Sequence, residues 1–540
     1  MKQLTKTDFI LYRECARNVW IKWHRPEEYN KFEISAFEKS LGVMGNEVEE
    51  LARGLFSGGY LIEKRSAGAQ DLTIKLISEH QPVIYQAVFS TDEYLAACDV
   101  LKWNPEANAY DIYEIKMSST MSQEDSGGSD DDEDDEEGKP KKVNKKKELQ
   151  YEYDLAFQTN VAKLCGVTFN KKYLVRLNKQ YIRMGKLDFS KLFEITDKTE
   201  MISDTFQSVT LTEMVNARTY LGGTTEPASP CLCYFKGRSS HCTSFSISNP
   251  HVPVYSVHDL YRIGNSKAYL AELLSEGILD VADVPEDDRL KPKKPSKGKE
   301  PSKPRKLNQV RVHKSKQEIV DIDAIRRELD SLQFPLYFLD YETYPTAIPP
   351  YDGYHPYQHI VFQYSLHILR DKHSKLEHVE CIIIEGDPAQ QIVASLRKNI
   401  GKTGTVISWY KKFENSRNRE LAHLMPLRDD RDFLNDLVLR TYDLMDIVQN
   451  QYYVHHGFKG SASIKKVQPV IAPDFSYKNL GVQNGTDAIE AYRQISKGIL
   501  TGIDAEKKKI EMLEYCKYDT EIMYIIWKFF TDLIEKDTNR

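Results

Sequence analysis

The pattern of apolar and polar positions divides the chain into two stretches, and each mixes strand-like with helix-like segments. Before residue 250 the pattern predicts two early helices, three strands and a later helix, over residues 6–23, 45–56, 84–89, 96–101, 110–116 and 149–165. After residue 330 it predicts further strands and helices, over residues 336–340, 360–369, 378–384, 389–400, 406–409 and 510–534. Both stretches therefore have the mixture that is typical of α/β domains.

Composition indicates a globular protein with more than one domain. The chain has 540 residues, of which 41% are hydrophobic and 11% aromatic, and this length exceeds what one core normally holds. The net charge is −6, but the eight acidic residues 130–137 account for more than all of it and leave +2 on the remainder. The net charge therefore does not exclude nucleic-acid binding, because basic surfaces can form locally.

Nothing in the sequence indicates a membrane protein. No apolar run reaches the length of a membrane span, and the first residues lack the apolar core of a signal peptide. A cytoplasmic protein without a membrane partner is therefore expected. In that compartment the eight cysteines are expected to be free, buried or bound to metal rather than paired in disulfides.

Two charged segments interrupt the hydrophobic pattern. Residues 121–147 join the acidic run to lysine clusters, and residues 291–306 are rich in lysine, proline and serine. Neither can bury enough apolar surface to offset the entropy of ordering, so both are predicted to be disordered. We therefore expect an N-terminal domain over residues 1–250 with an insert, a connecting region over 251–320, and a C-terminal domain over 321–540.

A hairpin in the first stretch carries a motif that suits phosphodiester hydrolysis. Asp99 lies on one strand, and the next strand carries Glu114 and Lys116 on one face, because strand side chains alternate. Two carboxylates can hold Mg²⁺ or Mn²⁺, which polarises a phosphate and activates a bound water, while a lysine positions that water or stabilises negative charge. The alternative is an ordinary surface strand, on which such triplets are common.

Residues elsewhere in the first stretch extend this motif. Glu49 offers a further carboxylate on the helix predicted over 45–56, and Gln158 lies on the helix that follows the insert. One early cysteine and three clustered late ones form a separate group: Cys15, Cys231, Cys233 and Cys242. Four thiolates suit a [4Fe–4S] cluster or a structural zinc ion, and free thiols in a loop are the alternative.

The second stretch carries its own carboxylates. A strand pair, a central residue and a helix pair follow in the order Asp340, Glu342, Glu414, Tyr515 and Asp519. The first two share a strand face, and the last two are four residues apart on one helix face. Four carboxylates can hold two metal ions that clamp the attacking and leaving oxygens, and a phenol can orient the attacking water. Asp443 and Asp446 are further candidates, and surface charges are the alternative.

In type and order, the residues of the first stretch resemble the RecB-family PD-(D/E)XK nucleases, particularly their iron–sulfur branch. The resemblance covers residues 1 to about 250 and implies a restriction-endonuclease-like α/β fold. It implies metal binding by Glu49, Asp99 and Glu114, and catalytic roles for Lys116 and Gln158. It also implies a [4Fe–4S] cluster, with zinc as the alternative, on Cys15, Cys231, Cys233 and Cys242.

The second stretch resembles DnaQ-like 3′–5′ exonucleases of the RNase H-like fold, in the variant with a tyrosine before the last aspartate. The resemblance implies a catalytic Tyr515 and Mg²⁺ or Mn²⁺ on four carboxylates: Asp340, Glu342, Glu414 and Asp519. The whole chain is also similar to an uncharacterised prokaryotic family that joins these two parts, through residues 348–353, 356–365 and 460–467.

Together these resemblances imply a metal-dependent DNA nuclease with two sites. The expected substrate is single-stranded DNA or DNA with free ends, in repair, recombination or defence. Two alternatives stay open: a nucleic-acid-binding scaffold in which one or both sites are degenerate, and an exonuclease directed at RNA.

Overall fold

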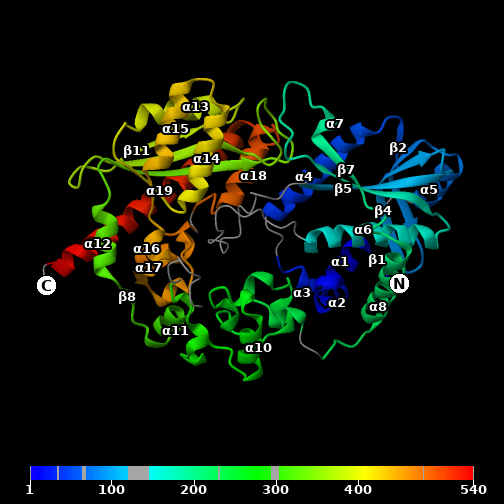
Figure 1. Cartoon of the computed structure of the whole chain (residues 1–540), viewed down its shortest axis with the longest axis horizontal. Coiled ribbons are helices and arrows are strands. Elements are labelled where there is room, and N and C mark those ends of the chain that lie inside the picture. Colours follow the sequence, from blue (N-terminus) through cyan, green and yellow to red (C-terminus); the bar gives the residue numbers. More distant parts are fainter. Residues whose placement is uncertain are drawn as a thin grey trace.

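The computed structural model has a mixed α/β architecture with two separate large sheets (Figure 1). It describes residues 2–32, 36–63, 68–119, 145–228, 231–292, 303–477 and 480–538. The segments expected to be disordered, 121–147 and 291–306, therefore lie mostly outside the described residues. At their ends the expectation is wrong, because residues 145–147 open the helix Lys145–Leu164 and residues 305–306 open the helix Arg305–Ser315.

The first sheet has its strands in the order β2-β3-β4-β5-β6-β7, with β1 paired to β4. The bounds are β1 Leu4–Thr5, β2 Gly59–Leu61, β3 Val83–Ser90, β4 Tyr94–Asn104, β5 Ala109–Ser119, β6 Phe169–Leu177 and β7 Phe193–Asp197. The predicted hairpin is β4 and β5, which run antiparallel with Val100 opposite Tyr113. This register brings Asp99 next to the Glu114 region at the end of the ladder.

The helices of this part pack on the sheet and on one another. They are α1 Lys6–Glu14, α2 Ala16–His24, α3 Pro26–Tyr29, α4 Ala36–Ala52, α5 Ala69–Ser78, α6 Lys145–Leu164, α7 Phe189–Leu192 and α8 Asp204–Gly222. The long α6 lies between the sheet and helices α1 and α8, with Phe157 fully buried in the core. The helix predicted over 6–23 is two helices, because Cys15 has an extended backbone with φ −159° and ψ 100°.

The connecting region folds into short helices with their own apolar core. Its elements are the 3₁₀ turns η2 Leu232–Phe235, η3 Arg238–Ser240, η4 Val257–Asp259, η5 Ile263–Asn265, η6 Val281–Asp283 and η7 Asp288–Leu290, and helices α9 Phe245–Ser248, α10 Lys267–Ser275 and α11 Arg305–Ser315. Leu270, Val281 and Val310 are fully buried in its core. Figure 1 shows α10 and α11 beneath α16 and α17 of the C-terminal part.

The second sheet has the order β11-β10-β9-β12-β13. Its bounds are β9 Leu336–Pro345, β10 His359–Leu369, β11 Glu377–Ile382, β12 Thr405–Ser408 and β13 Thr441–Asp443, and a separate pair joins β8 Ile319–Val320 to β14 Tyr453–Val454. Strand β10 runs antiparallel to both β9 and β11, whereas β12 pairs parallel with β9 and β13 pairs parallel with β12. The central β9 is buried along most of its length.

Helices cover both faces of this sheet. They are α12 Ile322–Asp330, α13 Ala389–Asn399, α14 Lys411–Leu424, α15 Arg428–Arg440, α16 Asp446–Gln449, α17 Ile464–Ile471, α18 Gly485–Ser496 and α19 Gly502–Thr538. Tyr337 and Leu339 of β9 pack with α13, α14 and α15, while Leu336 and Phe338 pack with α19. Since strand side chains alternate, Asp340 and Glu342 point to the α19 side. None of the described helices is long and apolar enough to cross a membrane.

The two parts contact each other along one edge. Helix α4 packs on α18 between the two sheets (Figure 1). Arg183 and the segment 353–354 exchange backbone hydrogen bonds of 2.9 and 3.0 Å, and the Tyr357 hydroxyl donates to the Met117 carbonyl. These contacts connect the end of β5 and the segment between β6 and α7 to the loop that follows β9.

Candidate active sites and metal centre

The predicted C-terminal site residues lie on strand β9 and on two helices, α14 and α19, that pack against it. Asp340 and Glu342 lie on β9, Glu414 on the first turn of α14, and Tyr515 and Asp519 on α19. Glu342, Glu414 and Tyr515 are buried. The fold therefore gathers residues that are up to 179 positions apart, Asp340 and Asp519, into electrostatic contact.

Sequence reasoning missed one member of this site. Cys516 is fully buried, and its Sγ lies 3.7 Å from Asp340 Oδ2. One carboxylate oxygen of Asp340, one of Glu342 and the sulfur of Cys516 lie within 4.8 Å of one another. Cys516 could have been predicted from its position directly after Tyr515, because two neighbouring positions of a helix can both contact a sheet that packs across it.

The C-terminal carboxylates repel one another. Burial, followed by the charge of neighbouring carboxylates, raises the pKa of Asp340, Glu342 and Glu414 well above the usual range. Burial also raises the pKa of Asp519 to about 6, although hydrogen bonds from Tyr477 and Tyr515 work in the opposite direction. The Tyr477 hydroxyl lies 2.5 Å from Asp519 Oδ1.

This donor set fits a divalent metal ion. Glu414 Oε2 is buried without a hydrogen-bond partner, although buried polar atoms are normally satisfied. Lys465 is the cation whose charge acts on Glu342 and Asp519, and it lies on the exposed start of α17. Hard oxygen ligands with excess negative charge are what Mg²⁺ and Mn²⁺ prefer, so Asp340 and Glu342 could hold such an ion. Glu414 and Asp519 are not in the group whose ligand atoms lie within 4.8 Å of one another, although their charges act at the same site.

The two further acidic candidates have structural partners. Asp443 accepts backbone hydrogen bonds from Tyr410 at 2.9 Å and Lys411 at 2.8 Å, and thereby holds the start of α14. Tyr410 adopts a left-handed conformation there, with φ 73°. Asp446 lies 3.7 Å from the Lys411 ammonium. Asp443 therefore positions the helix that carries Glu414.

The predicted N-terminal residues also come together. Asp99 Oδ2 accepts a hydrogen bond of 2.8 Å from the backbone of Ile115, and Glu114 Oε1 lies 2.8 Å from the Lys116 ammonium. Gln158, on α6, donates to Glu114 Oε2 at 2.6 Å. The hairpin and α6 thus meet at the fully buried Glu114 carboxylate.

Three residues that sequence reasoning did not assign complete this network. Lys6, at the start of α1, places its ammonium 2.5 Å from Glu114 Oε1. Gln86 donates to both Glu49 and Asp99 and so connects these two carboxylates. Asp154, one turn before Gln158 on α6, pairs with the Lys116 ammonium. Lys6 lies far from the motif in sequence, and no pattern marks it.

Cations balance the charge of the N-terminal site. Burial alone would raise the pKa of Glu114, but Lys116 and Lys6 outweigh it and hold that pKa below its usual range. Burial, together with the charge of Glu114, raises the pKa of Asp99 to about 7. Within the described ranges, the ligand atoms of Glu49, Asp99 and Glu114 do not form a group that lies within 4.8 Å.

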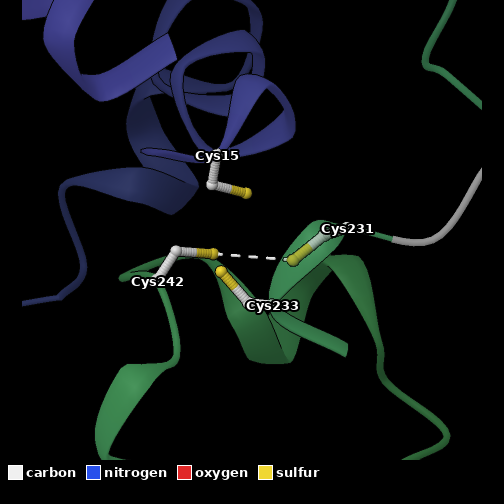
Figure 2. Close-up of side chains that lie close together, drawn as sticks. All are labelled: Cys15, Cys231, Cys233 and Cys242. Carbon is white, nitrogen blue, oxygen red and sulfur yellow. Dashed lines mark hydrogen bonds between the residues drawn. The ribbon is translucent and has the colours of Figure 1, made fainter. Parts of the chain in front are cut away.

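The four predicted cysteines form a compact cluster. Figure 2 shows Cys15, at the junction of α1 and α2, facing three cysteines from the segment 231–242. The four sulfur atoms all lie within 4.8 Å of one another, and those of Cys231 and Cys242 are 3.7 Å apart. All four are free thiols rather than disulfides. The protein therefore has a four-sulfur centre that could bind metal.

Contacts around the sulfurs support this centre. Hydrogen bonds among the four thiols, some of which raise and others lower the pKa, bring the pKa of Cys15, Cys231 and Cys233 to about 7 and raise the pKa of Cys242 above its usual range. A low thiol pKa favours the thiolate, which is the form that binds metal. The buried Asn18 of α2 accepts hydrogen bonds of 3.0 and 2.8 Å from the backbone and hydroxyl of Ser244, which ties the cysteine loop to α2.

One family model matches part of the C-terminal domain. The model of a domain of unknown function, DUF2779, matches residues 337–463, which include Asp340, Glu342 and Glu414 but neither Tyr515 nor Asp519. No solved structure matches the chain.

Two mycoplasma proteins are distant homologues of part of the chain. "Uncharacterized protein MG366" of Mycoplasma genitalium is 26% identical over 216 residues, which are 37% of this chain and 32% of that protein. Its homolog in Mycoplasma pneumoniae is 26% identical over 213 residues, which are 36% and 32% of the two chains. The chain thus spans about a third of the length of these curated relatives.

Proposed function

We propose that the protein is a metal-dependent nuclease that hydrolyses phosphodiester bonds of DNA at the C-terminal carboxylates. One observation carries the proposal: ligand atoms of Asp340 and Glu342 lie within 4.8 Å of each other, and burial with neighbouring carboxylates raises the pKa of Asp340, Glu342 and Glu414 well above the usual range. A buried group of carboxylates is costly unless a cation offsets it. Divalent ions there would polarise the phosphate and activate water.

The surrounding residues have roles that follow from their contacts. The buried Tyr515, whose pKa burial raises, stays protonated and can donate to Asp519 or to a water beside it. Lys465 can attract the phosphate to the carboxylates. The sheet order and the placement of carboxylates on β9, α14 and α19 support the RNase H-like fold that the sequence resemblance implies. Asp443 orients α14 and takes no part in the chemistry.

The N-terminal hairpin supports a second role in the same protein. The meeting of Asp99, Glu114, Lys116 and Gln158 is compatible with a PD-(D/E)XK nuclease site. The pairing of Glu114 with Lys6 favours the alternative that this domain binds DNA without cleaving it, because a resident cation occupies the position beside the carboxylate. We therefore assign the main hydrolytic activity to the C-terminal site.

A cleavage assay tests this assignment. End-labelled single-stranded DNA, double-stranded DNA and RNA are incubated with Mg²⁺, Mn²⁺ or EDTA and with wild type, Asp99→Asn, Asp340→Asn or the double variant. Asp429→Asn, on the exposed face of α15, is the matched control. We expect metal-dependent degradation of DNA that Asp340→Asn reduces about 10²-fold or more. Full activity of the double variant would refute the proposal, and faster degradation of RNA would redirect it to that polymer.

We infer that the four-cysteine centre binds one tetrahedral ion such as zinc. Zn–S bonds of about 2.3 Å place tetrahedral sulfurs about 3.8 Å apart, close to the 3.7 Å between Cys231 and Cys242. The [4Fe–4S] cluster that the resemblance implies binds each thiolate to a different iron and holds the sulfurs farther apart.

Metal analysis of anaerobically purified protein separates the two metals. One equivalent of zinc that is lost in Cys231→Ser but retained in Cys165→Ser, a cysteine outside the centre, is the expected result. Brown protein with about four iron atoms would establish the cluster instead.

A further inference from the structure

A pocket of about 410 Å³ lies between the connecting region and the loop that leads into α17. Its walls come from residues 237–239, 255, 258–265, 459–462 and 466. The volume is within the roughly 300–1,000 Å³ that ligand pockets typically have. The pocket is separate from the C-terminal carboxylates, since none of them lines it.

The lining of this pocket is strongly basic. Among the described residues that line it, Asp259 is the one carboxylate, and its Oδ2 lies 2.7 Å from the Arg238 guanidinium. Arg262, Lys459 and Lys466 add positive charges from three places in the sequence, and all three are exposed. Their charges exceed the local negative charge, so the pocket attracts anions.

A buried glutamine fixes the two walls of the pocket. Gln309 of α11 is 2% exposed, and its amide donates hydrogen bonds to the carbonyls of Asp259 at 2.8 Å and Lys459 at 3.0 Å. Its side-chain oxygen accepts one of 2.8 Å from the Tyr261 backbone. Gly460 has φ 80°, and a Cβ there would come within 2.4 Å of the Gln309 amide carbon. The basic groups are thus presented on a rigid frame.

The wall of the pocket is continuous with the elements that carry the C-terminal carboxylates. Val467 of α17 belongs to the same buried cluster as Ile522 of α19, the helix of Asp519. The Ala462 carbonyl, in the pocket, accepts a hydrogen bond of 3.1 Å from Trp409, which joins β12 to α14. These contacts attach the wall of the pocket to the elements that carry Glu414 and Asp519.

Two consecutive residues connect the pocket with the active site. Lys466 lines the pocket, while the charge of its neighbour Lys465 acts on Glu342 and Asp519. Adjacent positions on a helix point about 100° apart, so one turn of α17 presents an ammonium to each site. A phosphodiester chain has phosphates spaced along it that could occupy both.

We propose that this pocket is a phosphate subsite that holds the nucleic-acid strand outside the C-terminal active site. The inference rests on the proposed function, because it gives that site a polymeric rather than a mononucleotide substrate. Arg262, Lys459 and Lys466 bind backbone phosphates of the strand, and Gln309 is a positioning residue that acts through the walls. The contacts are to phosphate, so the subsite does not read the base sequence.

Strand binding measured without cleavage tests the subsite. A fluorescein-labelled 20-nucleotide DNA is titrated in EDTA with wild type and with Lys459→Glu/Lys466→Glu, at several salt concentrations. We expect the Kd of the double variant to rise at least about 10-fold. The slope of the logarithm of the binding constant against the logarithm of the salt concentration should become shallower by about 1.4, because two phosphate contacts are lost. The matched control is Lys375→Glu/Lys398→Glu, which changes net charge equally at exposed positions outside the pocket.

Competition and milder variants complete the experiment. Lys459→Gln/Lys466→Gln, with an unchanged melting temperature, should show a smaller loss in the same direction. Equal binding by test and control variants would overturn the inference, as would a wild type that binds inorganic phosphate or a mononucleotide but no strand. Pocket-dependent strand binding without cleavage would uphold the subsite and refute the proposed hydrolysis. Cleavage with pocket-independent binding would do the reverse.

Discussion

The two carboxylate sites of this protein use similar residues but differ in how their charge is balanced. In the N-terminal site, the ammonium groups of Lys6 and Lys116 lie 2.5 and 2.8 Å from the same oxygen of Glu114. In the C-terminal site, carboxylates face one another, and the pKa values of Asp340 and Glu342 are well above their usual range. The first site supplies its own cations, whereas we propose that the second takes its cations from solution.

From this difference we expect acidic motifs of equal quality in sequence to have unequal metal affinity. A carboxylate that already has a buried ammonium partner must lose that partner before an ion can bind. A carboxylate that is forced to share a proton gains from any divalent ion that replaces it. We therefore expect metal to act mainly on the C-terminal site.

The largest effect should come from Asp340→Asn. In wild type, Mn²⁺ at 100 times its Kd should add about 2.7 kcal/mol to the free energy of unfolding, which raises the Tm of the C-terminal part by about 5–10 °C. Asp340→Asn should abolish this gain, and in EDTA it should raise the Tm, because the amide removes a repelling charge. Differential scanning calorimetry with and without Mn²⁺ measures both changes.

The matched N-terminal variant makes this test a comparison. Asp99→Asn should retain most of the Mn²⁺ gain, as should the exposed Asp429→Asn. If Asp99→Asn removed the gain and Asp340→Asn kept it, the assignment of the two sites would be reversed.

The difference between the two sites also explains what the sequence could and could not predict. Alternation along strands placed Glu114 with Lys116 and Asp340 with Glu342, because those pairs lie within three residues of each other. Helix spacing likewise placed Tyr515 with Asp519. The sequence pattern thus predicted the mixed α/β fold and the local pairs within each site.

Long-range partners were beyond such patterns. Lys6 reaches Glu114 only because the short β1 pairs with β4 and delivers the start of α1 to the hairpin. Cys516 joins Asp340 only because α19 packs on β9. Charge balance depends on these tertiary contacts, and a local motif carries no information about them.

A second prediction removes a cation from the N-terminal site. Lys6→Met should lower the free energy of unfolding by about 1–3 kcal/mol, less than the cost of breaking a fully buried pair, because Lys6 is partly exposed and Lys116 remains. The variant should also gain an Mn²⁺ response that survives Asp340→Asn, because Glu114 has lost a resident cation. Chemical denaturation with and without Mn²⁺ measures both effects.

A lysine outside the site provides the control for Lys6. Lys22 pairs with Asp8 at 2.8 Å and has a similar partial exposure. Lys22→Met should lower stability without creating a metal response. An equal Mn²⁺ response in both lysine variants would show that Lys6 does not restrict metal binding.

A third prediction concerns pH. The raised pKa of Asp519, about 6, means that between about pH 4 and 6 the folded protein holds a proton that the unfolded chain releases. In EDTA the contribution of Asp519 to stability should therefore fall as the pH rises through this window and then stay level. Mn²⁺ binds the deprotonated form, so its gain in Tm should be small at pH 5 and largest above pH 7.

Buffer-matched calorimetry across this range checks the pH prediction. In wild type the increase in Tm caused by Mn²⁺ should become larger as the pH rises. Asp340→Asn should abolish this pH dependence, whereas Asp99→Asn should retain it. A metal gain that does not change between pH 5 and pH 7 would place the bound ion away from the raised carboxylates.

The smallest effect should come from a single hydroxyl. The Tyr477 hydroxyl donates a hydrogen bond to Asp519 Oδ1, which lowers the pKa of that carboxyl. Tyr477→Phe should therefore raise the pKa of Asp519 above about 6 and move the onset of the Mn²⁺ gain, and of cleavage, to higher pH by roughly half a unit to one unit. The matched N-terminal change, Gln158→Leu, removes a donor from Glu114, where two ammonium groups outweigh it. Its pH profile should not shift, and a shift as large as that of Tyr477→Phe would mean that both sites depend equally on outside cations.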